Sequence, residues 1–165
     1  MSNMLIPQVL DSEIDIERNK IRTDKLDITY GELASLYENR ELIIAPTYQR
    51  LFRLDIVQQT SFIESILLGF RTPAIFVAES DDGIWELVDG LQRLSTVFSF
   101  LGVLKDAEGN SVPPSRLSLA TAKSVALPSL EGFLFTELSL RSQLGIKRAS
   151  CRVEVIKVGS ASRMK

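Results

Sequence analysis

The chain contains no histidine and a single cysteine, Cys151, among its 165 residues. Without histidine, this chain cannot hold a serine–histidine–aspartate triad, a histidine-ligated metal nuclease centre or a histidine general base. One cysteine excludes internal disulfides and any metal site built from several cysteines. Chemistry within this chain therefore has to use carboxylates, arginines, hydroxyls, amides or an ion of the magnesium type.

Three further absences narrow the functional class. The sequence has no apolar run of transmembrane length, and its polar, acidic N-terminus does not resemble a signal peptide, so we expect no membrane partner and a cytoplasmic location. The net charge is −2, so no overall positive field favours nucleic acid, and DNA contact would require a local patch or a segment outside this chain. The G-x-x-x-x-G-K-[ST] pattern is missing, which excludes a P-loop enzyme.

The composition that is present predicts one globular domain with a real core. Apolar residues make up 45% of the chain and charged residues 24%. We expect a loosely held N-terminal arm or short first strand over residues 1–28, a folded domain over 29–158 and a tail over 159–165.

Alternating hydrophobic patterns and turn residues predict an α/β (α+β) fold with a small mixed sheet and packed helices. Thr29 and Asp55 each have capping-box spacing, which predicts a helix after each of them. A third helix should follow Asp89-Gly90 and end at Gly102. The remaining expected elements are strands at 42–44, 73–78, 84–88 and 151–158, a helix at 136–148, and an irregular region over 103–135.

The stretch Asp89-Gly90-Leu91-Gln92-Arg93 is the strongest candidate site. It forms a tight turn from a strand into a helix, and the free N–H groups and positive dipole end of a helix's first turn bind anions. Gly90 allows a ligand to approach the backbone, and Arg93 can offer two parallel donors to a phosphate. The alternative is that Asp89 and Gln92 form a capping box that needs no ligand.

The polar face of this third helix carries no acid and no lysine before Lys105. A helix facing solvent usually carries mixed charges. A face of hydroxyls, one amide and one guanidinium favours contact with a ligand or with another part of the protein. This face consists of Gln92, Arg93, Ser95, Thr96 and Ser99.

A second candidate is the loop Pro46–Arg53, which directly follows an expected strand. It contains Tyr48 and the two arginines Arg50 and Arg53, and binding loops often lie at strand ends. The alternative interpretation is a surface connector whose Tyr48 and Phe52 side chains are tucked into the core.

Taken together, these segments resemble the N-terminal domain of GmrSD-type restriction endonucleases. The loop Tyr48-Gln49-Arg50 matches that family's Tyr/Phe-Gln-Arg motif, and Asp89–Arg93 matches its Asp-Gly-Gln-Gln-Arg motif with Leu91 in place of the first glutamine. The helix and the Pro-Ala-Ile-Phe-Val strand between the two motifs also match, in the same order. The resemblance spans residues 43–100.

The resemblance implies a ParB/sulfiredoxin-like fold and a nucleotide-binding role, with possible NTP hydrolysis, in defence against phage and modified DNA. By analogy, Asp89 would be a catalytic or Mg²⁺-orienting carboxylate, and Gln92 and Arg93 would act at the phosphates of an NTP. The expected nucleotide contacts are Tyr48, Gln49, Arg50, Gly90, Arg93, Ser95 and Thr96. The family's C-terminal nuclease domain would lie outside this chain, so we expect a domain truncated at its C-terminal end and DNA contact through the missing part or a partner.

Two other functions stay open at the level of sequence. A ParB-like DNA-binding module would use Arg50, Arg53, Arg71 and Arg93 on phosphates, and its affinity would fall steeply with salt. A non-catalytic interaction domain would use the Asp89–Arg93 turn only to cap a helix. The identity of the nucleotide and the oligomeric state are not determined by the sequence.

Overall fold

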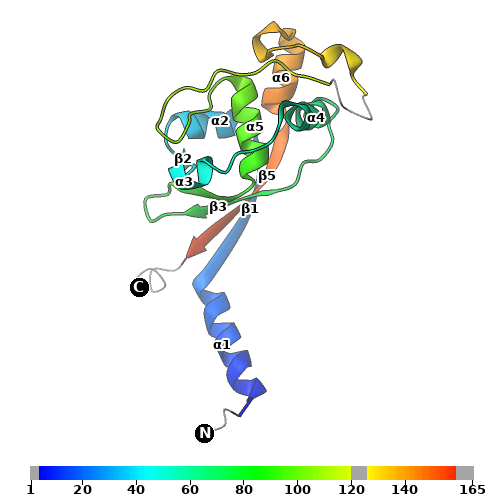
Figure 1. The fold of residues 1–165 in the computed structure, drawn as a ribbon. Helices are drawn as coiled ribbons and strands as arrows, with labels where there is room; N and C mark the ends of the chain where they lie inside the picture. Colours follow the sequence, from blue (N-terminus) through cyan, green and yellow to red (C-terminus); the bar gives the residue numbers. More distant parts are fainter. Residues whose placement is uncertain (1–3, 120–125, 159–165) are drawn as a thin grey trace.

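A five-stranded mixed sheet, in the order β1-β5-β3-β4-β2, organises the computed structural model (Figure 1). The structure describes residues 4–119 and 126–158, and the tail expected over 159–165 lies outside them. β1 is antiparallel to β5 and β3 is antiparallel to β4, whereas the β5–β3 and β4–β2 pairs are parallel. The expected α/β class with a small mixed sheet is therefore confirmed. The strands are β1 (Ile21–Thr29), β2 (Leu42–Ile43), β3 (Ile75–Glu79), β4 (Trp85–Asp89) and β5 (Ser150–Val158).

Helices cover one face of this sheet, and α5 lies between α2 and α4 in that layer (Figure 1). Burial alternates along β5, where Cys151 and Val153 are buried while Arg152 between them is exposed. This alternation is typical of a sheet with one face on the core and one face in water. The helices are α1 (Pro7–Lys20), α2 (Tyr30–Glu38), α3 (Pro46–Gln49), α4 (Ile56–Leu67), α5 (Leu91–Leu101) and α6 (Leu140–Arg148), with short 3₁₀ turns at Pro128–Leu130 and Phe135–Glu137.

Helix α5 is the centre of the core. Leu91 and every residue from Leu94 to Phe100 are buried. The Phe98 ring stacks on the ring of Tyr37 from α2, with 4.5 Å between centroids. Gly102 ends the helix in the left-handed conformation, as the sequence predicts. Because α5 is buried on nearly all sides, its first turn has a fixed position.

The two residues with capping-box spacing each begin a helix, as the sequence predicts. The Thr29 hydroxyl accepts a hydrogen bond from the Glu32 N–H at 3.1 Å and begins α2. Asp55 and Gln58 exchange hydrogen bonds of 2.8 and 3.2 Å and begin α4. Side chain–backbone contacts within one turn need no tertiary partner, which is why sequence predicts them well.

The N-terminal segment, expected as a loosely held arm or a short first strand, forms a helix followed by a strand. Residues 7–20 form helix α1, and β1 is a nine-residue edge strand along the whole of β5. The cross-strand ion pairs Asp27–Arg152 and Lys25–Glu154 accompany this pairing. The segment is polar and charge-mixed, so its apolar pattern is weak; its strand is stabilised by β5, which is distant in the sequence.

Two smaller differences concern segment boundaries. The expected loop 46–53 contains the short helix α3, and the helix expected from residue 136 begins only at Leu140, where the Ser139 hydroxyl caps it. Among the described residues, no helix combines the length and the apolar character needed to cross a membrane.

Candidate functional site

A cavity of about 230 Å³ opens where the end of β4, the start of α5 and the short helix α3 meet. It contains the whole Asp89–Arg93 motif, as well as two residues from the preceding loop. Its lining residues are Tyr48, Leu51, Asp89, Gly90, Leu91, Gln92 and Arg93. The fold therefore brings the two sequence motifs together at one surface, through Tyr48 on one side and the strand-to-helix turn on the other.

The turn does not form the Asp89–Gln92 capping box that was the alternative interpretation of this stretch. Gly90, not Asp89, is the N-cap of α5, and the Asp89 Oδ1 atom accepts a hydrogen bond of 2.9 Å from the N–H of Gly90. Asp89 still belongs to β4, so its carboxylate lies one residue too early to reach the first helical turn. Among the described residues no side chain caps this turn, which leaves its backbone N–H groups available at the cavity.

Two structural features require glycine at position 90. Its φ of 105° is a conformation that side chains disfavour. A Cβ built at this position would also lie 2.6 Å from Cγ2 of Ile75 and 3.3 Å from Nη2 of Arg93. The glycine thus allows the turn to pack directly on β3.

Gln92 holds the adjacent loop in place. Its Nε2 donates to the backbone oxygen of Leu51 at 2.8 Å, and its Oε1 accepts from the N–H of Arg53 at 3.0 Å. Both ends of the amide are therefore engaged by backbone. In this geometry Gln92 has a structural role, and the catalytic role that the resemblance implies for it stays a prediction.

The Arg93 side chain points toward the start of β3. Its Nη2 donates to the carbonyl oxygen of Ala74 at 2.9 Å, which orients the guanidinium. Its Nε is buried, and no described atom accepts a hydrogen bond from it. A buried donor without a partner is costly. This atom is therefore one that an oxygen-bearing ligand would satisfy.

The hydroxyl face of α5 is not part of the cavity. Ser95 and Thr96 have no exposed surface and Ser99 is 8% exposed, so these side chains face the protein interior. The Thr96 hydroxyl donates to the Gln92 carbonyl at 2.7 Å. Neither Ser95 nor Thr96, both expected as ligand contacts, lines the cavity. The Thr96 hydroxyl is satisfied by bonding back to a carbonyl one turn earlier, whereas the buried Ser95 Oγ has no hydrogen-bond partner among the described atoms.

The Tyr48-Gln49-Arg50 motif is divided by the turn of α3. The Tyr48 hydroxyl donates to the Val88 carbonyl at 3.1 Å, and the half-buried ring lines the cavity. Gln49 and Arg50 instead line a neighbouring cavity of about 320 Å³. We expected both to reach the same cavity as Arg93, and neither does, because successive residues of a helical turn point to different sides.

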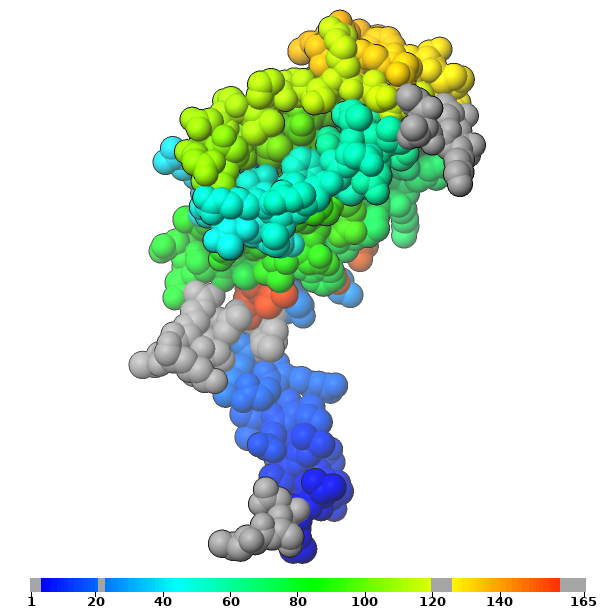
Figure 2. All heavy atoms as spheres, viewed as in Figure 1, coloured from blue at the N-terminus to red at the C-terminus, as the bar shows by residue number. Residues whose placement is uncertain are grey.

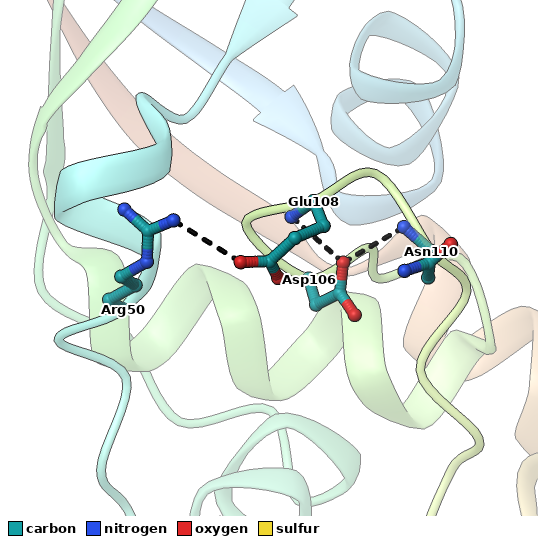
Figure 3. Close-up of polar contacts among 4 residues, drawn as sticks. All are labelled: Arg50, Asp106, Glu108 and Asn110. Atoms are coloured by element: carbon teal, nitrogen blue, oxygen red, sulfur yellow. Dashed lines mark hydrogen bonds and ion pairs between the residues drawn. The ribbon is translucent and has the colours of Figure 1, made fainter.

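Arg50 is held by a partner that the sequence did not reveal. It makes an ion pair of 3.2 Å with Glu108, in a loop where the Asp106 carboxylate accepts hydrogen bonds from the N–H groups of Glu108 and Asn110 (Figure 3). From the sequence, residues 103–135 are expected only to form an irregular region. The acidic character of Asp106-Ala107-Glu108 was the available signal, since an acidic loop complements exposed arginines.

Asp89 does not belong to a cluster of three or more metal-ligating side chains among the described residues. Within residues 4–119 and 126–158, no three Asp, Glu or Cys side chains gather closely enough to form a metal site. A magnesium ion often uses only one or two carboxylates together with phosphate oxygens of a ligand. Asp89 therefore suits a shared metal ion rather than a site built by protein alone.

Behind Arg93 lies a buried polar cluster. The Tyr30 and Thr72 hydroxyls are 2.7 Å apart. Burial raises the pKa of Tyr30 well above its ordinary value of 10.0, with the nearby Cys151 adding to the rise and the Thr72 hydrogen bond and Arg93 charge opposing it. Burial likewise raises the pKa of the Cys151 thiol from 9.0.

We expect the free energy of unfolding to decrease as the pH rises above about 9. The unfolded chain then releases protons from Cys151 and Tyr30, while the folded chain keeps them, so stability is complete below the unfolded pKa values of 9.0 and 10.0 and declines above them. The slope is about 1.4 kcal/mol per pH unit for each retained proton. Urea denaturation across this range measures it. Tyr30→Phe should reduce the slope above pH 10.0, and an unchanged slope would contradict the assignment to Tyr30.

Comparison with models of protein families identifies the domain. The model described as the N-terminal domain of the GmrSD restriction endonuclease matches residues 32–150, well over half of the chain. The match includes both the α3 loop and the turn into α5. Searches of curated proteins and of solved structures found no match. The chain therefore belongs to the family of GmrSD restriction endonuclease N-terminal domains.

Proposed function

We propose that this domain binds a nucleoside triphosphate with Mg²⁺ in the cavity between α3 and α5, as part of a restriction system that acts on DNA. The observation that carries the proposal is that the uncapped first turn of α5 and Arg93, whose buried Nε has no acceptor among the described atoms, line the same cavity. Both are donors without protein acceptors, and phosphate oxygens are acceptors.

The start of α5 would receive the phosphates. A helix of eleven residues presents free N–H groups and the positive end of its dipole at its first turn, and these favour an anion. Gly90 lines the cavity and has no side chain to cover the backbone of this turn. Arg93 adds a fixed positive charge, since its contact with Ala74 orients the guanidinium before any ligand arrives.

Because of Asp89, the proposed site needs Mg²⁺ to bind a triphosphate. Its exposed carboxylate lies in the cavity lining, beside the position proposed for the phosphates. Two neighbouring anions repel each other. A magnesium ion bound jointly by the carboxylate and phosphate oxygens converts this repulsion into attraction. Mg²⁺ would supply this charge neutralisation when bound.

The opposite wall is suited to the base or sugar. The half-buried Tyr48 ring and the Leu51 side chain, which is 55% exposed, form the apolar part of the lining. Aromatic and aliphatic walls with a few placed polar groups are typical of nucleotide-sized pockets. The proposal is limited to binding, because the amide of Gln92 is occupied by the loop backbone and offers no group to activate water.

DNA-backbone binding by the four arginines is less well supported. Arg50 is paired with Glu108, and Arg93 is directed to the Ala74 carbonyl inside a cavity. Arg71 lines a third cavity beside Arg152, separate from the one that contains Arg93. Arg53 lines the same cavity as Arg50, but Arg71 and Arg93 each line a different one. A phosphodiester strand requires a continuous positive surface, and the four side chains do not share one cavity.

The test is thermal unfolding with Mg²⁺ and each of ATP, GTP, CTP and UTP. A nucleotide at about one hundred times its dissociation constant should add about 2.7 kcal/mol of stability. Arg93→Gln should lose this increment, each variant being compared with its own nucleotide-free state. Arg71→Gln is the matched control, because it removes the same charge from an exposed position outside the cavity.

Asp89→Asn tests the role of the metal ion. We expect the wild-type chain to bind the nucleotide with Mg²⁺ and much more weakly with EDTA, whereas Asp89→Asn should bind similarly in both conditions. The proposal is wrong if no nucleotide stabilises the chain, or if Arg93→Gln and Arg71→Gln respond to nucleotide alike.

A further inference from the structure

Helix α1 buries none of its residues against the rest of the described chain. It projects from the body of the molecule and contacts β1, which follows it (Figure 2). Val9 and Leu10 are 53% and 57% exposed. A helix of this length is marginal in water unless an apolar face is buried against something. The helix therefore needs a surface to pack on.

One face of α1 has a distinctive order of residues. At 100° per residue, Ile6, Val9 and Leu10 fall on the same side as Glu13 and Glu17. The first half of this face is apolar, and the second half carries the two acids, with Lys20 at its end pairing with Glu17 at 3.0 Å. Its natural complement is an apolar groove bordered by positive charges.

Helix α6 carries such a groove. A cavity of about 450 Å³ on its outer surface is lined by Leu140, Arg141, Leu144, Gly145 and Arg148. Leu140 is 70% exposed, and both arginines are exposed. The groove thus combines an apolar floor with guanidinium groups at its border.

Gly145 gives independent support for a helix seated there. It lies inside a nine-residue helix, where glycine is disfavoured relative to alanine, yet a Cβ at this position would meet no atom within 4 Å. No contact within the described chain explains the glycine. A second helix packed closely across α6 would explain it, since a missing Cβ allows a close backbone approach.

The α1 of one chain cannot fill the α6 groove of that same chain, because the two helices lie at opposite ends of the molecule (Figure 1). We propose that α1 of one copy packs into the α6 groove of a second copy, with Glu13 and Glu17 facing Arg141 and Arg148. A two-fold axis makes the exchange reciprocal, so each dimer contains the contact twice. This dimer is independent of the nucleotide proposal.

Charge reversal gives a decisive test by sedimentation equilibrium of the whole chain. Glu13→Arg/Glu17→Arg and Arg141→Glu/Arg148→Glu should each weaken self-association by about tenfold or more, because like charges then face each other. An equimolar mixture of the two variants should associate as tightly as the wild-type chain, since both contacts in the mixed dimer pair opposite charges. A monomeric wild-type chain, or a mixture that stays dissociated, would overturn the proposal.

Two controls separate this contact from other causes. Asp11→Arg/Asp15→Arg makes the same charge change on the opposite side of α1 and should leave the association unchanged. Gly145→Ala should raise the unfolding temperature of the dissociated chain, because alanine favours the helix, and should weaken the dimer. Equal association of Gly145→Ala and the wild-type chain would contradict the close approach at α6.

Discussion

Replacing Gly90 with alanine is expected to lower the free energy of unfolding by about 3 kcal/mol, from the sum of backbone strain and overpacking. The strain arises because φ at this position is 105°. The overpacking arises because the new Cβ would lie 2.6 Å from Cγ2 and 3.1 Å from Cβ of Ile75, a buried residue of β3. Urea denaturation monitored by circular dichroism measures the loss.

Gly102→Ala is the matched control for this prediction. Gly102 has a φ of 80° at the other end of the same helix, but a Cβ there would meet nothing within 4 Å. Gly102→Ala should therefore lower the free energy of unfolding only by the cost of backbone strain, about 1 kcal/mol. If both substitutions cost the same, the contact with Ile75 is not what requires glycine at position 90.

Phe98→Ala should destabilise the fold by about 4 kcal/mol, the range observed when a buried aromatic ring is deleted. Phe98 has no exposed surface, and its ring stacks on Tyr37 at a centroid distance of 4.5 Å. The substitution removes apolar burial and leaves a cavity between α5 and α2. Because α5 positions the candidate site at its first turn, weaker packing there should also reduce nucleotide stabilisation of the folded state.

Phe70→Ala makes the same chemical change at a position that is 64% exposed, and it should cost less than about 1 kcal/mol. Equilibrium unfolding in urea compares the two variants under identical conditions. A similar loss in both would show that Phe98 does not contribute to the core as its burial indicates.

The buried setting of α5 has a consequence for the proposed site. Its phosphate-binding groups are fixed before a ligand arrives: Arg93 is oriented by Ala74, and the adjoining loop is held by Gln92. A site ordered in advance loses less conformational entropy on binding. The same rigidity explains why the motif contains residues that never touch the ligand in our proposal.

Several features were determined by the sequence alone because their causes are local. The N-cap at Thr29, the capping box at Asp55, the stop at Gly102 and the strand-to-helix turn at Asp89-Gly90 each depend on residues within one or two turns. The family was also visible in the sequence, since its two motifs occur in order with matching elements between them.

The tertiary structure decided which polar residues share the candidate site. Ser95 and Thr96 turn inward because α5 is surrounded by other elements, and Gln92 bonds to a loop about forty positions away in the chain. Arg50 pairs with Glu108, which removes it from the cavity of Arg93. Such contacts depend on how distant segments pack, and a periodic pattern in one segment contains no information about its partner. For the same reason, only the folded chain shows that no residue of α1 is buried.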